Sequence, residues 1–83
     1  MALDERTKEL VAVGASITAN CGPCLEYHTR KAREAGADGA EIAQAADVGR
    51  LVRKGAAGKL DALSAKILEG PAVSSSEGCG CAT

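Results

Sequence analysis

One helix is expected to end and another to begin within the stretch Asn20-Cys21-Gly22-Pro23-Cys24-Leu25-Glu26-Tyr27-His28. Asparagine breaks helices and is a favourable N-cap, and proline is tolerated in the first turn of a helix, where N–H groups lack intrahelical partners. Asn20 is therefore expected to cap a helix that runs from about Cys21 to Ala35. Gly36 follows as the left-handed residue that commonly ends a helix.

Apolar spacing predicts another helix before this turn. Leu10, Val13 and Ile17 recur at helical intervals between Asp4 and Ala19. The first turn of this segment is acidic, and the positive end of a helix favours acidic side chains. We therefore expect a first helix over about residues 4–19.

Two further helices are expected after Gly36. Asp38 followed by Glu41 has the pattern of an N-cap with a reciprocal acidic partner, so a helix should begin there. The helical spacing of its apolar residues ends at Gly55-Ala56-Ala57-Gly58, which we interpret as an interruption. A fourth helix should follow and end at Gly70-Pro71. The apolar face of the third helix would be Ile42, Ala45, Gly49 and Val52, and that of the fourth Leu60, Leu63 and Ile67.

The helical spacing of the apolar residues, with no strand-like alternation, predicts an all-α fold, a small helical bundle, and the composition favours completion of this bundle by oligomerisation. A chain of 83 residues forms one domain and removes only roughly 60% of its unfolded surface from water. Its hydrophobic fraction is 46%, but it has no Trp or Phe and one Tyr, so much of that fraction is Ala, which buries little area. Such a chain gains by burying surface against copies of itself, and we expect a homo-oligomer.

Charge and hydropathy exclude several classes of partner. The chain has ten basic and eleven acidic residues, for a formal net charge of −1. The basic residues are scattered along the sequence, so nucleic acid is not expected as a partner. The longest strongly apolar stretch, Leu10 to Ala19, is about half of the ~20 residues that span a bilayer, which predicts a soluble protein without a membrane partner. Met1-Ala2-Leu3-Asp4-Glu5 lacks the features of a secretory signal, which favours a cytoplasmic location.

Four cysteines in a reducing compartment are interpreted as reactive or metal-binding. On a helix that begins near Cys21, positions three and four apart share a face, so Cys21, Cys24 and His28 form one line. The imidazole should lean back onto the turn that carries Cys24. A helix N-terminus and an imidazolium both favour a thiolate, and the C-x-x-C spacing allows a disulfide to close. Peroxide would convert one thiolate into a sulfenic acid, which the neighbouring thiol would resolve.

The chain is expected to have two parts, a helical redox domain over residues 1–69 and a flexible tail over residues 70–83. The tail contains Ser74-Ser75-Ser76 and Cys79-Gly80-Cys81, a composition too polar and flexible to pack. Cys79 and Cys81 could shuttle electrons to the redox centre, bind a soft metal, or have no resolvable role.

The stretch Asn20–His28, followed by Lys31-Ala32 and Glu34-Ala35-Gly36-Ala37, resembles the carboxymuconolactone decarboxylase family, and within it the alkylhydroperoxidase D branch. The motif of that branch is a Glu twelve positions before the first Cys of C-x-x-C-x-x-x-H, and Glu9 stands at that distance from Cys21. The resemblance covers about residues 9–58. It implies a thiol-dependent, peroxiredoxin-type antioxidant enzyme that reduces peroxides.

The resemblance also implies roles for the site residues. Cys24 would attack the peroxide, Cys21 would resolve the product and meet the reductant, and Glu9 with His28 would relay protons. The protein would be an all-helical trimer or hexamer, re-reduced by a lipoyl protein or a thioredoxin-like donor, with no cofactor and no bound metal. The chain departs from the branch at the position immediately before the second Cys. The branch places a His there, whereas this chain has Pro23, which carries no proton.

Three other functions remain open from the sequence. Pro23 favours a disulfide exchanger or electron carrier with little peroxidase activity. Cys21, Cys24 and His28 could instead bind zinc in a structural module, with a cysteine of the tail as the fourth ligand. Lactone decarboxylation rests on the family name alone, and the decarboxylating members do not depend on a C-x-x-C pair.

Overall fold

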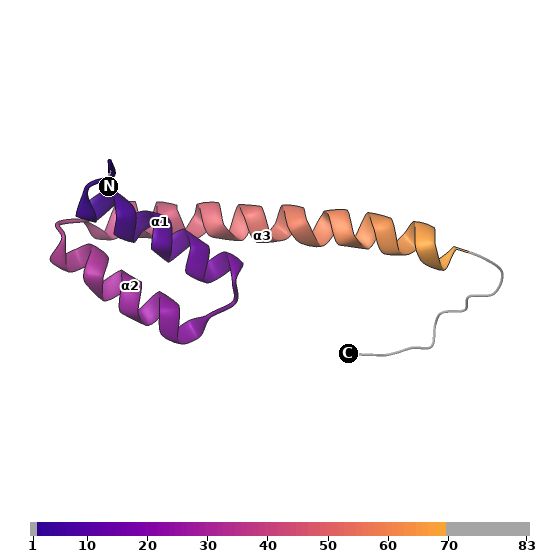
Figure 1. Ribbon diagram of the computed structural model, residues 1–83, viewed down its shortest axis with the longest axis horizontal. Helices are drawn as coiled ribbons and strands as arrows, with labels where there is room; N and C mark the ends of the chain where they lie inside the picture. The colour runs from indigo at the N-terminus through magenta and orange to yellow at the C-terminus, as the bar shows by residue number, and fades with distance from the viewer. Residues whose placement is uncertain (1, 70–83) are drawn as a thin grey trace.

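The computed structural model describes residues 2–69, which form three α-helices and no strand. These helices are α1 (Glu5–Thr18), α2 (Gly22–Glu34) and α3 (Gly39–Leu68). α1 packs against both α2 and the first half of α3, whereas α2 and α3 meet at few positions. The second half of α3 extends away from the other two helices (Figure 1). The predicted all-α fold is confirmed, and the expected tail over residues 70–83 lies outside the described residues.

The first two helices begin at side-chain caps. Asp4 accepts a hydrogen bond from the Thr7 N–H at 2.7 Å, and this bond holds the pKa of the Asp4 carboxyl below its usual range. The N-cap of α2 is Cys21, whose Sγ accepts the Cys24 N–H at 3.2 Å. The predicted N-cap at Asn20 is therefore wrong. Asn20 has a φ of +57°, so it ends α1 in the left-handed conformation and does not cap α2.

The start of α3 follows the sequence prediction. Asp38 accepts the Glu41 N–H at 2.8 Å, and the Glu41 side chain accepts the Asp38 N–H at 3.1 Å, which together form a capping box. Gly36 has a φ of +99°, a conformation that glycine adopts without steric cost. Local residues thus determine the turn between α2 and α3.

The predicted interruption at Gly55-Ala56-Ala57-Gly58 is wrong, because α3 is one continuous helix of 30 residues. A glycine within a helix costs about 1 kcal/mol relative to alanine, but it keeps its N–H and causes no clash. The two alanines between the glycines are the best helix formers, and no proline follows before Pro71. The predicted third and fourth helices are therefore two halves of α3.

The core is small and depends on close contact between backbones. Within the described residues, the buried hydrophobic side chains are Val13, Ile17, Ala32, Ala37 and Ile42. α1 and α3 approach where Gly14 faces Gly49. A Cβ on Gly14 would lie 2.8 Å from the Ala45 carbonyl oxygen, and a Cβ on Gly49 would overlap the Gly14 carbonyl. Glycine is therefore required on both sides of this contact. None of the helices in residues 2–69 is long and apolar enough to cross a membrane.

Gly49→Ala is expected to lower the free energy of unfolding by about 2 kcal/mol or more, because the new methyl group meets the Gly14 backbone and Ile17 Cβ. Gly58→Ala is the matched control, since a Cβ there meets nothing within 4 Å. It should raise stability by up to about 1 kcal/mol through helix propensity. Urea denaturation followed by circular dichroism measures both variants. A Gly49→Ala protein as stable as Gly58→Ala would contradict this packing of α1 on α3.

Candidate redox site

Cys21 and Cys24 are joined by a disulfide across the first turn of α2, with their Cα atoms 5.3 Å apart. This separation falls within the range that a disulfide can bridge without backbone movement. Pro23 lies in the same turn, where its missing N–H leaves no intrahelical bond unmade. The sequence predicted both the redox-capable pair and the place of the proline in the first turn.

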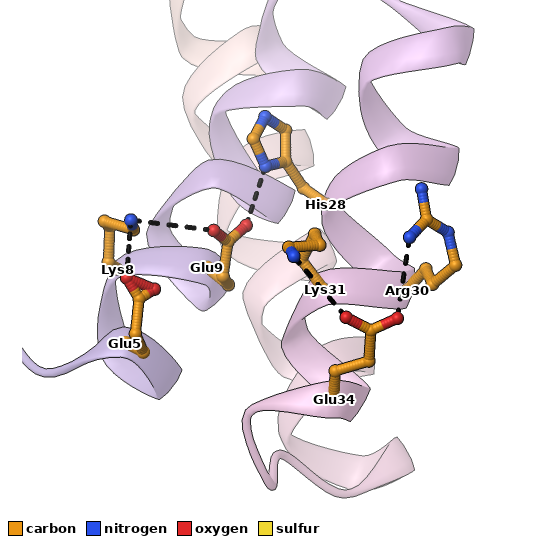
Figure 2. A network of polar contacts seen from close by, with 7 residues as sticks. All are labelled: Glu5, Lys8, Glu9, His28, Arg30, Lys31 and Glu34. Carbon is orange, nitrogen blue, oxygen red and sulfur yellow. Dashed lines mark hydrogen bonds and ion pairs between the residues drawn. The ribbon is translucent and has the colours of Figure 1, made fainter.

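The second part of the site is a hydrogen bond between α1 and α2. Nδ1 of His28 lies 2.7 Å from Oε1 of Glu9 (Figure 2). The Glu9 side chain is only 7% exposed, and a buried carboxylate is costly unless it is paired. His28 supplies that partner and is itself 30% exposed. Two residues that stand 19 positions apart in the sequence thus form one acid–base pair.

The Glu9 contact assigns different roles to the two ring nitrogens of His28. When Nδ1–H donates to the carboxylate, Nε2 is the nitrogen that can accept and release a proton. The ring is also held from the side, because Tyr27 makes an edge-to-face contact with it at 4.9 Å between ring centroids. The imidazole therefore has a defined orientation on α2, on the face that also carries Cys24 four residues earlier.

Solvent approaches Glu9 from the side away from the disulfide. A surface cavity of about 320 Å³ is lined by Glu9 together with Glu5, Lys31 and Glu34. Nζ of Lys8 lies 3.9 Å from Oε2 of Glu9 and 2.7 Å from Oε2 of Glu5 (Figure 2). The hydrogen bond with Glu5 raises the pKa of Lys8 above its usual range, so Lys8 stays cationic beside the buried carboxylate.

Sequence reasoning missed Arg53, which attaches the turn before Cys21 to α3. Nη1 of Arg53 donates to the Ile17 carbonyl oxygen at 3.2 Å and to Oδ1 of Asn20 at 2.9 Å. Oγ1 of Thr18 donates to the Gly49 carbonyl oxygen at 2.9 Å and adds a second attachment. No local signal could reveal the Arg53 contact, because it lies more than thirty residues from its partners in the sequence.

A second surface cavity opens beside the disulfide. It has a volume of about 170 Å³, and Cys21 and Arg53 both line it, with Asn20, Gly22 and Leu25 among the other lining residues. A molecule that exchanges thiols with the disulfide could therefore reach Cys21 from this side.

The structure joins the predicted site residues in two pairs, Cys21 with Cys24 and Glu9 with His28. It does not gather a metal site from residues 2–69, where no group of three or more His, Cys, Asp or Glu side chains could hold an ion. The tail cysteines that were considered as zinc ligands or electron shuttles, Cys79 and Cys81, lie outside the described residues.

A family profile matches residues 1–65, a span that contains both pairs. The chain belongs to the Carboxymuconolactone decarboxylase family. This membership confirms the resemblance found in the sequence, and the family contains decarboxylating and peroxidase enzymes. The chain is also similar to a Paracoccus denitrificans protein described as "Uncharacterized protein 4 in cox locus", with 43% identity over 56 residues. That match covers 68% of the chain and spans about half (50%) of the relative's length. No solved structure matched the chain.

Arg53→Ala is expected to lower the free energy of unfolding by about 1 kcal/mol, because two oxygens at the end of α1 lose a charged donor. Arg50→Ala is the control on the same helix, since Arg50 makes only an exposed pair with Asp47. Its effect should stay below about 0.5 kcal/mol. Chemical denaturation measures both, and equal losses would contradict a specific attachment by Arg53.

Proposed function

We propose that the protein is a thiol-dependent peroxidase that cycles between the Cys21–Cys24 disulfide and the dithiol. One observation carries the proposal: the buried Glu9 carboxylate orients His28 one helical turn after Cys24. A reactive thiol needs a nearby group that removes its proton, and that group works best when a third side chain orients it. The alkylhydroperoxidase D motif found in the sequence also supports this activity.

In the proposed cycle, the Cys24 thiolate attacks one oxygen of a hydroperoxide and the O–O bond breaks. The alkoxide leaves with one proton as an alcohol, and Cys24 becomes a sulfenic acid. The Cys21 thiol then attacks the Cys24 sulfur, water leaves, and the disulfide forms. A dithiol reductant supplies two electrons and two protons, which restore both thiols while the reductant becomes a disulfide.

His28 and Glu9 would move the protons of this cycle. Nε2 of His28 would take the proton from the Cys24 thiol and pass it to the leaving alkoxide. Glu9 would fix the ring orientation and stabilise the imidazolium that forms in between. The reductant, a lipoyl protein or a thioredoxin-like donor, would reach Cys21 through the cavity that this residue lines.

A disulfide exchanger or electron carrier with little peroxidase activity is the second candidate. Pro23 favours it, because it takes away a proton-carrying position between the two cysteines. Rapid exchange with a small disulfide or dithiol, combined with negligible peroxide consumption, would identify this function.

The first test compares peroxide consumption by the wild type, Cys24→Ser and Cys21→Ser in the presence of dihydrolipoamide. Cys24→Ser is expected to lose turnover, because the attacking sulfur is gone. Cys21→Ser cannot close the disulfide and should accumulate a sulfenic acid on Cys24, which dimedone traps and mass spectrometry locates. Equal peroxide turnover by Cys24→Ser and the wild type would overturn the proposal.

The second test addresses proton transfer. His28→Gln and Glu9→Gln are each expected to slow peroxide reduction by about 100-fold or more, the usual contribution of a positioned acid–base group. Glu34→Gln is the control, because Glu34 lines the cavity next to Glu9 without contacting His28. Unchanged rates in His28→Gln would remove the imidazole from the mechanism.

A further inference from the structure

The cavity beside the disulfide is bordered by a cation. Of the described residues that line this cavity of about 170 Å³, Arg53 is the one with a charged side chain, and Cys21 is another lining residue. Arg53 is exposed, so a dissolved molecule can reach it. Pockets that enclose a drug-sized ligand have about 300–1,000 Å³, so this smaller space suits a small molecule. Such a molecule would meet a sulfur of the redox pair and a positive charge together.

The hydrogen bonds of Arg53 fix its position without cancelling its charge. Nη1 donates to the Ile17 carbonyl oxygen and to Oδ1 of Asn20, and both of these acceptors are neutral. Ile17 and Asn20 also line the cavity, so the guanidinium lies at its edge. Arg50, three residues earlier on α3, instead bonds to the Asp47 carboxylate at 2.7 Å. A guanidinium has five N–H donors, so Arg53 can keep its two bonds through Nη1 and bind a carboxylate through the other nitrogens.

The cavity on the Glu9 side of the site has a different charge. Its charged lining residues are Glu5, Glu9, Glu34 and Lys31, and Lys8 adds a second ammonium group beside two of these carboxylates (Figure 2). That cavity therefore has no excess of positive charge to attract an anion, whereas the cavity at Cys21 has one. Local charge raises the concentration of molecules of the opposite sign. An anionic molecule is thus directed to the disulfide and away from the acid–base pair.

We propose that the electron donor is a small dithiol that carries a carboxylate, and that Arg53 binds this carboxylate while a donor thiolate attacks Cys21. The inference rests on the proposed function, because it names the class of reductant for the same disulfide. The attack forms a mixed disulfide on Cys21 and breaks its bond to Cys24, which leaves as a thiolate. The second donor thiol then attacks the donor sulfur of the mixed disulfide and releases Cys21. The donor becomes a cyclic disulfide, and its two thiol protons end on Cys21 and Cys24.

The test measures how fast two reductants of the same shape reduce the disulfide of the full chain in the absence of peroxide. Dihydrolipoate and dihydrolipoamide have the same dithiol and differ by one negative charge. After alkylation, mass spectrometry of the tryptic peptide of residues 9–30 quantifies reduced Cys21 and Cys24 separately from Cys79 and Cys81. At low ionic strength, dihydrolipoate should react about three- to fivefold faster with the wild type. The formal net charge of the chain, −1, would by itself favour the neutral reductant.

Three variants would assign this preference to Arg53. Arg53→Gln removes the charge, while its amide can still donate a hydrogen bond, and it should lose the preference. Arg53→Lys keeps the charge and should keep the preference. Arg50→Gln is the matched control, because Arg50 pairs with Asp47 and is not among the residues that line the cavity. The ratio of the two rates decides, since a loosened turn would change both rates alike. Added salt should lower the ratio of the wild type.

Equal rates with the two reductants in the wild type would overturn the inference, as would an unchanged ratio in Arg53→Gln. Both outcomes are independent of peroxidase activity, because no peroxide is present. A chain that consumes no peroxide can still prefer the anionic reductant, and an active peroxidase can lack that preference. A wild-type disulfide that neither dithiol reduces would overturn this inference and the proposed cycle together.

Discussion

The contact between Gly14 and Gly49 is the constraint on which the rest of the structure depends. A chain with so few large side chains cannot hold its helices together by filling space between them, so α1 and α3 meet backbone to backbone. This contact brings the Thr18 hydroxyl to the Gly49 carbonyl and Arg53 to the end of α1. The turn that leads into Cys21 is therefore fixed from α3, although the disulfide itself lies on α2.

The opposite side of α1 determines the position of α2. Glu9 is buried there, and the cost of burying a carboxylate is offset only if α2 presents a hydrogen-bond donor at the right place. His28 is that donor, so the rotation of α2 about its axis follows from the pairing. Cys24 is four residues earlier on the same helix and thereby shares the face of His28. One interaction thus stabilises the fold and assembles the proposed acid–base pair.

The sequence predicted those structural features that depend only on residues close together in the chain. The capping box at Asp38 and the left-handed Gly36 require only local contacts, and both predictions were confirmed. Asn20 does not cap α2, because it is left-handed and Cys21 takes the N-cap position, and its side chain instead accepts a hydrogen bond from Arg53, a partner that the local sequence does not reveal. The glycines near Ala56 do not end α3 as predicted, since an isolated glycine weakens a helix without ending it.

The same distinction applies to the site. Helical register alone predicted that the two cysteines and His28 share one face, because Cys24 and His28 lie on α2 and Cys21 is its N-cap. Glu9 belongs to another helix, and only the spacing shared with a known family singled it out. Contacts between helices depend on how those helices pack, and a single sequence does not state that packing.

Pro23 changes where protons could travel in the proposed cycle. In the first turn of α2 the proline ring has no proton to give, while the neighbouring Cys24 N–H is already bonded to the Cys21 sulfur. Neither of these groups in the turn can therefore carry a proton to or from the thiol. In the proposed cycle, the remaining route would run from the Cys24 thiol to Nε2 of His28 and from there to the leaving alkoxide, while Glu9 holds the ring through Nδ1. A peroxidase built in this way depends on the α1–α2 contact for its chemistry, and loss of that contact would leave only disulfide exchange.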